Sequence, residues 1–155
     1  MIDRIFSLLK GDVKAAKSEA RAPSGLQIAV GALLVEAARR DDVFSADEQG
    51  AIKRLLAERF SLSDDDTQKL FDVAEETSAA SGQLFGFTNK VVKELDEADR
   101  VHVIEMLWEV AYADGVLDAH EDAMIRRVAG LIYVSDFDRG AARRRVLERL
   151  NLPVT

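Results

Sequence analysis

The chain has 155 residues and a hydrophobic fraction of 48%, which suits one globular domain that buries roughly 70% of the surface its unfolded chain exposes. It contains no cysteine, so disulfide bonds, thiolate zinc sites and cysteine nucleophiles are excluded. The net charge of −7 disfavours nucleic acid as a partner and favours cations, and no apolar run approaches the ~18 residues of a membrane-spanning helix.

Residues 1–21 predict an amphipathic N-terminal helix or arm. They carry five basic and three acidic residues, a net charge of +2, which leaves −9 for the rest of the chain. We expect the apolar stripe to dock on the body of the protein; contact with a membrane surface or with a partner protein are the alternatives. The segment is not a secretory signal, because Asp3 and Lys10 interrupt its short apolar run. The stripe consists of Ile2, Ile5, Phe6, Leu9 and Val13.

After a break at residues 22–25, residues 26–155 predict a single all-α domain, a compact bundle of about seven to eight helices. Helix-forming Ala, Leu, Glu, Arg and Lys recur, and the strict alternation of strands is missing. Helices are expected over about residues 26–40, 87–95 and 136–150, and after the capping residues Ser45, Ser63, Asp96 and Asp118. Glu48 would complete a capping box with Ser45.

The sequence contains an internal repeat. A shift of 73 residues superposes residues 33–55 on residues 106–128 without gaps, and nine of the 23 positions are identical. The pattern keeps a Glu five residues before an Asp and a second Glu seven residues after it, which helical amphipathicity does not require. We therefore interpret it as a duplicated helix, acidic loop, helix unit, with copies over about residues 26–60 and 99–133. The simplest arrangement packs the two copies against each other about a pseudo-two-fold axis.

The two loops also agree in conformational type. Gly115 follows a helix end, where a left-handed residue commonly stops the turn. Its counterpart is Asp42, and Asp is one of the few other residue types that tolerate positive φ. We therefore expect Asp42 to adopt positive φ if the loops share one shape.

Carboxylates gather in both copies, and clustered carboxylates bind hard cations such as Ca²⁺ or Mg²⁺. The loops are too short for an EF-hand, so a cation would need carboxylates from both copies. The alternative is that these residues only cap helices and bond loop amides. Acidic loops that meet at one pocket would favour the cation. The candidate ligands are Glu109, Asp114, Asp118 and Glu121 in the second copy, beside Asp122, and Glu36, Asp41 and Glu48 in the first, beside Asp42 and Asp47.

Glu36 and Glu109 lie near the inward face of apolar helices, where a carboxylate needs a partner. One interpretation pairs them with neighbours on the same helix: Arg39, Arg40 or Tyr112. The other places the two glutamates face to face, sharing a cation or a buried arginine.

Motifs for catalysis are missing. No G-x-S-x-G, G-x-x-x-x-G-K or G-x-G-x-x-G occurs, and His102 and His120 lack the spacing of a zinc enzyme. Trp108 is expected in the core, and the arginines over residues 139–149 are expected on a solvated helix face, with an anionic partner as the alternative.

The segment WEVAYADGVLDAHEDAMIRRVAGLI resembles the signature of the tellurite-resistance TerB-like family, roughly A-x-A-D-G-x-Φ-x-x-x-E before an apolar helix. The resemblance covers about residues 26–150, and LLVEAARRDDVFSADE matches it in the first copy with Asp42 in place of the glycine. A related domain forms the N-terminal part of DjlA-type membrane co-chaperones. The matching residues are Ala111, Ala113, Asp114, Gly115, Leu117 and Glu121.

This resemblance implies an all-α bacterial protein of the cytoplasm, tied to stress or tellurite resistance and to assemblies at the inner face of the inner membrane. It implies divalent-cation binding by acidic loop residues, with Asp114, Glu121 and Glu109 first, then Asp41, Glu48 and Glu36. We therefore expect a non-enzymatic module that binds protein partners, with a metal-free scaffold docked on a membrane-associated partner as the alternative. A metal-dependent hydrolase is disfavoured, because it would need an open coordination site.

Overall fold

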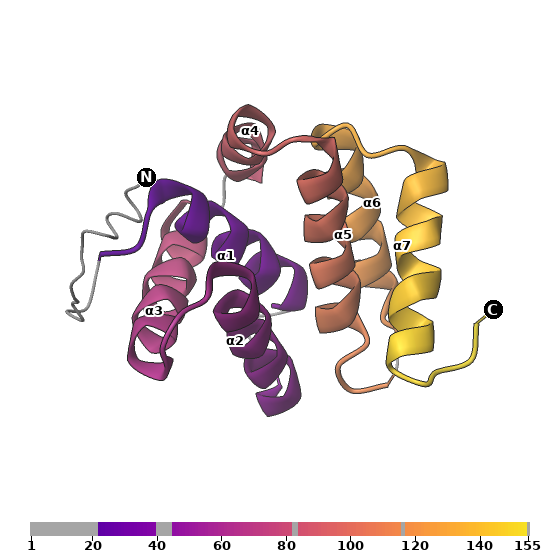
Figure 1. Cartoon of the computed structure of the whole chain (residues 1–155), viewed down its shortest axis with the longest axis horizontal. Helices are drawn as coiled ribbons and strands as arrows, with labels where there is room; N and C mark the ends of the chain where they lie inside the picture. Colours follow the sequence, from indigo (N-terminus) through magenta and orange to yellow (C-terminus); the bar gives the residue numbers. More distant parts are fainter. Residues whose placement is uncertain (1–21, 40–44, 82–83, 116, 155) are drawn as a thin grey trace.

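The computed structural model describes residues 22–39, 45–81, 84–115 and 117–154. This part of the chain is helical throughout and forms a compact bundle, which confirms the all-α prediction (Figure 1). No helix within it is long and apolar enough to cross a membrane. Its helices are α1 Gly25–Ala38, α2 Ala46–Phe60, α3 Asp64–Ser81, α4 Leu84–Glu94, α5 Glu97–Ala111, α6 Ala119–Leu131 and α7 Asp136–Arg149.

The helices form two three-helix units. In Figure 1, α1, α2 and α3 lie on one side of the molecule and α5, α6 and α7 on the other, and α4 lies across the top between them. The units meet where α1 packs against α5, and α2 also contacts α5. The two segments that the sequence repeat superposes therefore contact each other at this junction.

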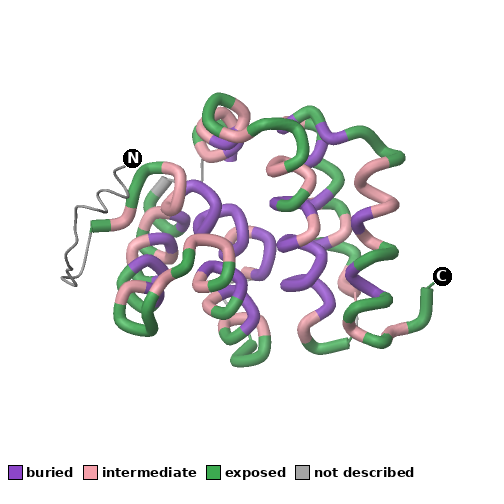
Figure 2. The backbone as a smooth tube through the Cα atoms, viewed as in Figure 1, coloured by how far each residue is buried: buried purple, intermediate pink, exposed green. Residues whose placement is uncertain are grey.

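Helix α1 and the second half of α5 are buried on nearly all sides. Figure 2 shows that buried residues concentrate on them. Helix α1 is buried along almost its whole length from Ala29 to Ala38, which is wider than the single stripe of an ordinary surface helix. In α5 the run from Met106 to Ala111 is buried without a break, and it includes Trp108, as predicted. A helix of this kind needs neighbours all round, and the other helices supply them.

The predicted caps set the helix boundaries. Ser45 and Glu48 form the expected capping box at the start of α2, with the Ser45 hydroxyl 3.1 Å from the Glu48 amide. Ser63 and Asp96 accept from the third residue of α3 and α5, as predicted. Helix α4 begins at Leu84, three residues before the predicted start. Leu84 and Thr88 lie one turn apart and are both buried, so packing holds this first turn, and Gly86 between them lies in open space.

The ends of α2 and α6 resemble each other. After each helix the chain reaches a residue with positive φ, Ser61 at 53° and Tyr133 at 62°. The amide of the next residue then donates to a carbonyl five residues back, at 3.0 Å for Leu62 and 2.9 Å for Val134. A serine follows and caps α3 and α7 in turn, Ser63 and Ser135. Helix α7 ends with the same turn at Asn151, so the turn is not specific to the predicted repeat, and the duplication stays a prediction.

Gly115 has φ of 87°, as predicted for the end of the α5 turn. Its counterpart Asp42 lies outside the described residues, as does the segment 1–21, so the shared loop shape and the docking of the segment stay predictions. The pseudo-two-fold relation between the units also stays a prediction.

The contact between α1 and α3 requires a glycine. A methyl group at Gly31 would lie 2.9 Å from the Cβ of Ala74 on α3, which is closer than two such atoms approach. We predict that Gly31→Ala lowers the free energy of unfolding by about 1–3 kcal/mol, because overpacking outweighs the gain of about 1 kcal/mol in helix propensity. Urea denaturation measures the change.

Gly50→Ala is the matched control, because Gly50 lies inside α2 with nothing near its Cβ position. It should raise the free energy of unfolding by about 0.5–1 kcal/mol. A stabilisation by both substitutions would show that α1 and α3 are not in tight contact.

Candidate functional site

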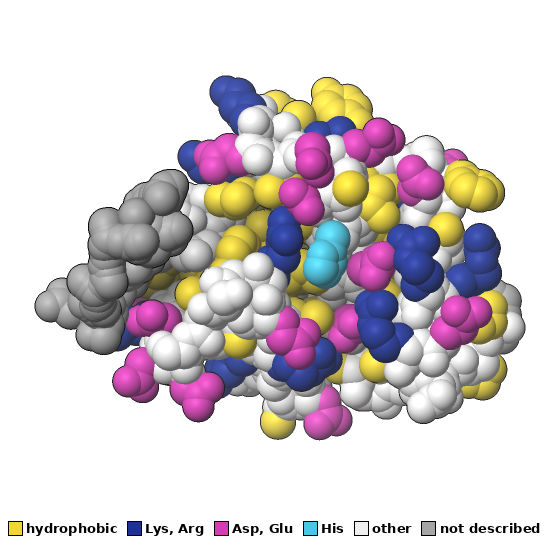
Figure 3. Space-filling view, viewed as in Figure 1, with side chains coloured by type: hydrophobic (Ala, Val, Ile, Leu, Met, Phe, Trp, Pro, Cys, Tyr) yellow, Lys and Arg dark blue, Asp and Glu magenta, His cyan; other side chains and the backbone are white. Residues whose placement is uncertain are grey.

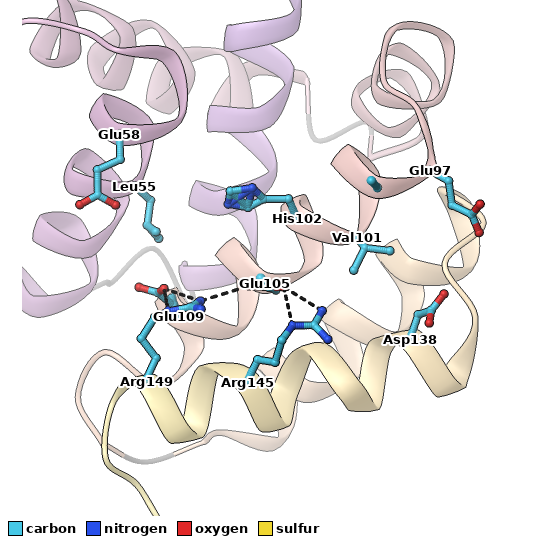
Figure 4. A pocket seen from close by; sticks show the side chains of 11 residues that line it. Leu55, Glu58, Glu97, Val101, His102, Glu105, Glu109, Asp138, Arg145 and Arg149 are labelled. Atoms are coloured by element: carbon cyan, nitrogen blue, oxygen red, sulfur yellow. Dashed lines mark hydrogen bonds and ion pairs between the residues drawn. The ribbon is translucent and has the colours of Figure 1, made fainter.

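An open groove of about 720 Å³ lies between α2, α5 and α7. Figure 3 shows the face of the molecule on which acidic and basic side chains gather beside hydrophobic surface. Figure 4 shows the side chains that line the groove, which come from all three helices. The lining combines apolar Leu55, Ala98 and Val101 with His102, the carboxylates Glu58, Glu97, Glu105, Glu109 and Asp138, and the guanidinium groups of Arg145 and Arg149.

Glu109 is the buried charge of this groove, with 7% of its side chain exposed. Arg149 of α7 donates from Nε to its Oε1 at 3.0 Å, and Arg54 of α2 donates from Nη2 to its Oε2 at 3.0 Å. Each carboxylate oxygen therefore has its own guanidinium partner, and the partners come from different three-helix units. This satisfies the requirement that a buried charge be paired and hydrogen-bonded.

Further ion pairs continue from Glu109 in both directions. Glu105 accepts from Arg145 at 2.8 Å and from Arg149 at 3.2 Å, and Arg54 lies 3.7 Å from Glu58. The resulting ion-pair network alternates in sign from α7 through α5 to α2. Its members are Arg145, Glu105, Arg149, Glu109, Arg54 and Glu58.

The network acts on the pKa of Arg149. Partial burial alone would lower the pKa of Arg149, but hydrogen bonds and charge from Glu109 and then Glu105 outweigh it and raise the pKa above its ordinary value. Because the pKa of Arg149 is raised, the stability that its charge contributes is lost only as pH rises through that pKa, far above neutral pH. The guanidinium of Arg149 therefore does not titrate near neutral pH.

Of the five arginines of α7 that were predicted to lie on a solvated face, Arg144, Arg145 and Arg149 are exposed, whereas Arg139 and Arg143 are partly buried. Arg143 lies 5.9 Å from the ring centroid of Trp108, and its Nε donates to the hydroxyl of Tyr112 at 2.8 Å. Arg139 pairs with Asp136, and its carbonyl accepts from the Trp108 indole at 3.2 Å. The Arg143 side chain and the Arg139 carbonyl therefore hold α7 against α5, and the guanidinium groups of both residues are engaged within the protein.

The structure also decides the partners of the two inward glutamates. Glu36 accepts from the hydroxyl of Ser78 on α3, and Glu109 is held by Arg54 and Arg149. For Glu109 the prediction of a partner on the same helix is wrong, because its side chain meets the neighbouring helices and the Tyr112 hydroxyl bonds Arg143. For Glu36 the candidate Arg40 lies outside the described residues. The two glutamates share no arginine, since their partners are different residues.

The acidic loop residues are dispersed. Glu48 belongs to its capping box, Asp118 accepts from the amide of His120 at 2.7 Å, and Asp114 is exposed. Glu121 is buried, at 5% exposure, in the first turn of α6. Asp41 lies outside the described residues. Within the described ranges, no group of three or more His, Asp or Glu side chains is placed to hold a metal ion.

A small pocket of about 370 Å³ lies beside the loop that follows α5. Asp47, from the first turn of α2, and Gly115, from that loop, both line it. Glu109 and Arg54 form its wall toward the groove. We call it the loop pocket. It lies between the start of α2 in the first unit and the end of α5 in the second.

Sequence reasoning did not identify the groove, although a signal for it exists. Glu105 and Glu109 lie one helical turn apart on α5, and Arg145 and Arg149 lie one turn apart on α7. Matching i, i+4 pairs of opposite charge on two helices are what an interhelical ion-pair network requires. His102, Glu97 and Asp138 have no such pattern, because only the packing of α5 against α7 brings them to one groove.

Glu109 should contribute much more to stability than an exposed member of the same network. We predict that Glu109→Gln lowers the free energy of unfolding by about 2 kcal/mol, less than the ~3–5 kcal/mol of a fully buried pair because both arginines are half exposed and can rehydrate. Glu58→Gln, at a side chain 66% exposed, should change it by less than ~0.5 kcal/mol. Equal effects in urea denaturation would contradict this.

Comparison with known proteins shows which family the chain resembles. The family model described as "Tellurite resistance protein TerB" matches residues 27–144, which is more than half of the chain and includes the whole of α2 to α6. No curated protein and no solved structure gives a significant match. The matched range spans both copies of the acidic motif, and with it the resemblance seen in the sequence is confirmed: the chain belongs to the TerB family.

Proposed function

We propose that this TerB-family chain is a non-enzymatic interaction module of a tellurite-resistance or stress-response system, and that it binds a protein partner in the groove. The observation that supports this most is the groove itself, in which an apolar floor is surrounded by charged groups from three helices. Apolar centres with polar rims are typical of protein-binding surfaces.

The charge of the groove indicates which partner would bind. Its arginines are already engaged by Glu105 and Glu109, whereas Glu97 and Asp138 carry charge at the rim toward the starts of α5 and α7. The lining contains five carboxylates and two arginines. A partner segment with an apolar stripe and basic residues beside it would complement this surface and would be steered to it over a Debye length of ~8 Å in physiological salt.

The chemistry of the lining favours binding over catalysis. His102 is the imidazole of the groove, and the lining holds no hydroxyl, thiol or amine nucleophile beside it. The strongest charges neutralise each other in the ion-pair network, which makes them structural elements of the site. This supports the non-enzymatic proposal over a hydrolase.

The place of action belongs to the same proposal. We place the chain in the cytoplasm, at assemblies on the inner face of the inner membrane, where it would meet a membrane-associated partner. A metal-free scaffold with this docking role is the closest alternative, and it uses the same groove.

Charge reversal of the rim tests the partner proposal. We predict that Glu97→Lys with Asp138→Lys abolishes tellurite resistance in host cells that depend on this chain, because the partner's basic residues would be repelled. The matched control is Asp64→Lys with Asp65→Lys, which makes the same charge change in a helical first turn on the other unit. Growth in graded tellurite is the measurement, with thermal unfolding as the check on folding. Full resistance with the rim variant would contradict the proposal.

We also propose that the acidic loops bind a divalent cation, Ca²⁺ or Mg²⁺. Two features support this: Asp47 of α2 and Gly115 of the loop after α5 line one pocket, and Glu121 is buried in the first turn of α6 instead of lying in solvent. Since no three described carboxylates converge, such a cation would draw on main-chain oxygens and water as well. The ligands proposed from the sequence stay Asp114, Glu121 and Asp118, with Asp41 and Glu48 from the first loop; Glu36 and Glu109 have protein partners instead.

Calorimetric titration of chelator-treated protein tests the cation. We predict saturable binding at ~10⁻⁶–10⁻⁴ M, lost in Asp114→Asn with Glu121→Gln and kept in the exposed control Glu76→Gln. No heat of binding, with the double variant only melting at a lower temperature, would show that these carboxylates act as caps.

A further inference from the structure

We propose that the turn from α6 to α7 is a second docking surface, on which the exposed rings of Tyr133 and Phe137 bind a protein segment that carries an apolar side chain between basic residues. This surface goes beyond the groove of the proposed function, whose lining includes neither ring. The exposure of both rings, the backbone conformation at Tyr133 and the charge around them support it.

The two rings are the most exposed large hydrophobic side chains of the described chain, and they lie within five residues of each other. Tyr133 is 73% exposed and Phe137 is 76% exposed. Single apolar side chains are normal on a protein surface, whereas Tyr and Phe are enriched where proteins bind each other. Figure 3 shows hydrophobic side chains at the edge of the molecule beside the adjoining ends of α6 and α7, with acidic side chains among them.

The turn between α2 and α3 offers a comparison within the same molecule. Ser61 and Tyr133 have similar positive φ values, 53° and 62°, and two residues later a serine caps the next helix in each turn. At the exposed positions two residues before and two residues after that serine, the α2–α3 turn has Ser61 and Asp65, and the α6–α7 turn has Tyr133 and Phe137. The backbone of the turn therefore does not require aromatic residues.

Tyr133 is an unfavourable residue for its own backbone conformation. A positive φ crowds the Cβ atom of any residue other than glycine, and Asn and Asp tolerate it best. The similar turn after α7 has Asn151 at this position, with φ of 60°. The Tyr133 side chain lies mostly in solvent, so it returns little packing energy for this strain. Strained residues of this kind cluster at binding sites, which supports a binding role for the ring.

The charge beside the rings indicates which class of partner would bind. Asp136 is 91% exposed, although it pairs with Arg139, and Asp138 follows Phe137 on α7. Glu97 adds a carboxylate in the first turn of α5, and Figure 1 shows that α5 starts at the same end of the molecule as the α6–α7 turn. Carboxylates beside aromatic rings complement a segment with basic residues beside an apolar side chain.

The same charge disfavours a second copy of this chain and a membrane as occupants. A symmetric dimer through the turn would bring Asp136 and Asp138 of both copies together, and each copy has a net charge of −7. Anionic lipid headgroups would repel the same carboxylates. A basic protein segment meets neither penalty.

Two substitutions test the surface without weakening the fold. We expect Tyr133→Asn with Phe137→Ser to remove tellurite resistance from host cells that depend on this chain, because the partner loses both rings. The unfolding temperature should stay the same or rise, since asparagine suits a positive φ and both rings are exposed. Ser61→Asn with Asp65→Ser is the matched control and should keep resistance. Full resistance with the aromatic variant, or an equal loss with the control, overturns the proposal.

Photo-crosslinking in the same cells tests the occupant. Phe137→benzoylphenylalanine should give a covalent product with another protein, and Asp65→benzoylphenylalanine should not. Asp136→Lys should lower the yield of that product, whereas Asp64→Lys, at the matching position of the α2–α3 turn, should leave it unchanged. No product at position 137, equal products at both positions, or a product of two copies of this chain overturns the proposal. Sedimentation of the purified chain with phosphatidylserine vesicles that Phe137→Ser abolishes would assign the rings to a membrane and overturn it as well.

The turn and the groove can fail separately. If the aromatic variant keeps resistance while Glu97→Lys with Asp138→Lys abolishes it, the groove stands as the partner site and the turn does not bind. If the aromatic variant loses resistance while the rim variant keeps it, the turn is the docking surface and the groove proposal fails.

Discussion

The rest of the structure depends on one buried carboxylate. Glu109 lies where the two three-helix units meet, and it is held at one oxygen by Arg54 from the first unit and at the other by Arg149 from the second. Because a buried charge must be paired, the carboxylate restricts how α2 and α7 approach α5. The groove has its shape because α2 and α7 are held on either side of α5. The loop pocket lies on the other side of the Arg54–Glu109 pair.

The predicted duplication accounts for the arrangement of the helices but not for the ion-pair network and the groove. Arg54 and Arg127 occupy equivalent positions in the two copies, as do Glu36 and Glu109. Among the described residues, however, the Arg54–Glu109 pair has no counterpart between Arg127 and Glu36, because Glu36 bonds to Ser78 instead. If the predicted duplication holds, its two copies differ in this ion pair. Because of this difference we expect a single partner instead of two equivalent ones.

The sequence predicts the framework well because the framework depends on local signals. Serine and aspartate caps, the glycine of the α5 turn and apolar periodicity are each encoded within a few residues, and the described helices follow them. The groove depends on which helices become neighbours. Periodicity shows that Glu109 points inward, but not that Arg149, 40 residues away, meets it. The predicted helix over residues 87–95 begins too late because the burial of Leu84 cannot be seen from the sequence.

The central claim is that Glu109 couples the two units through its two arginines. A double-mutant cycle with Arg54→Gln and Arg149→Gln, followed by urea denaturation, measures this coupling most directly. Either single change leaves Glu109 with one guanidinium, whereas the double variant leaves a buried carboxylate with neither. The account predicts that the double variant loses at least about 1 kcal/mol more than the two single losses combined. Losses that add within ~0.3–0.5 kcal/mol would contradict it, because the arginines would then form two independent surface pairs.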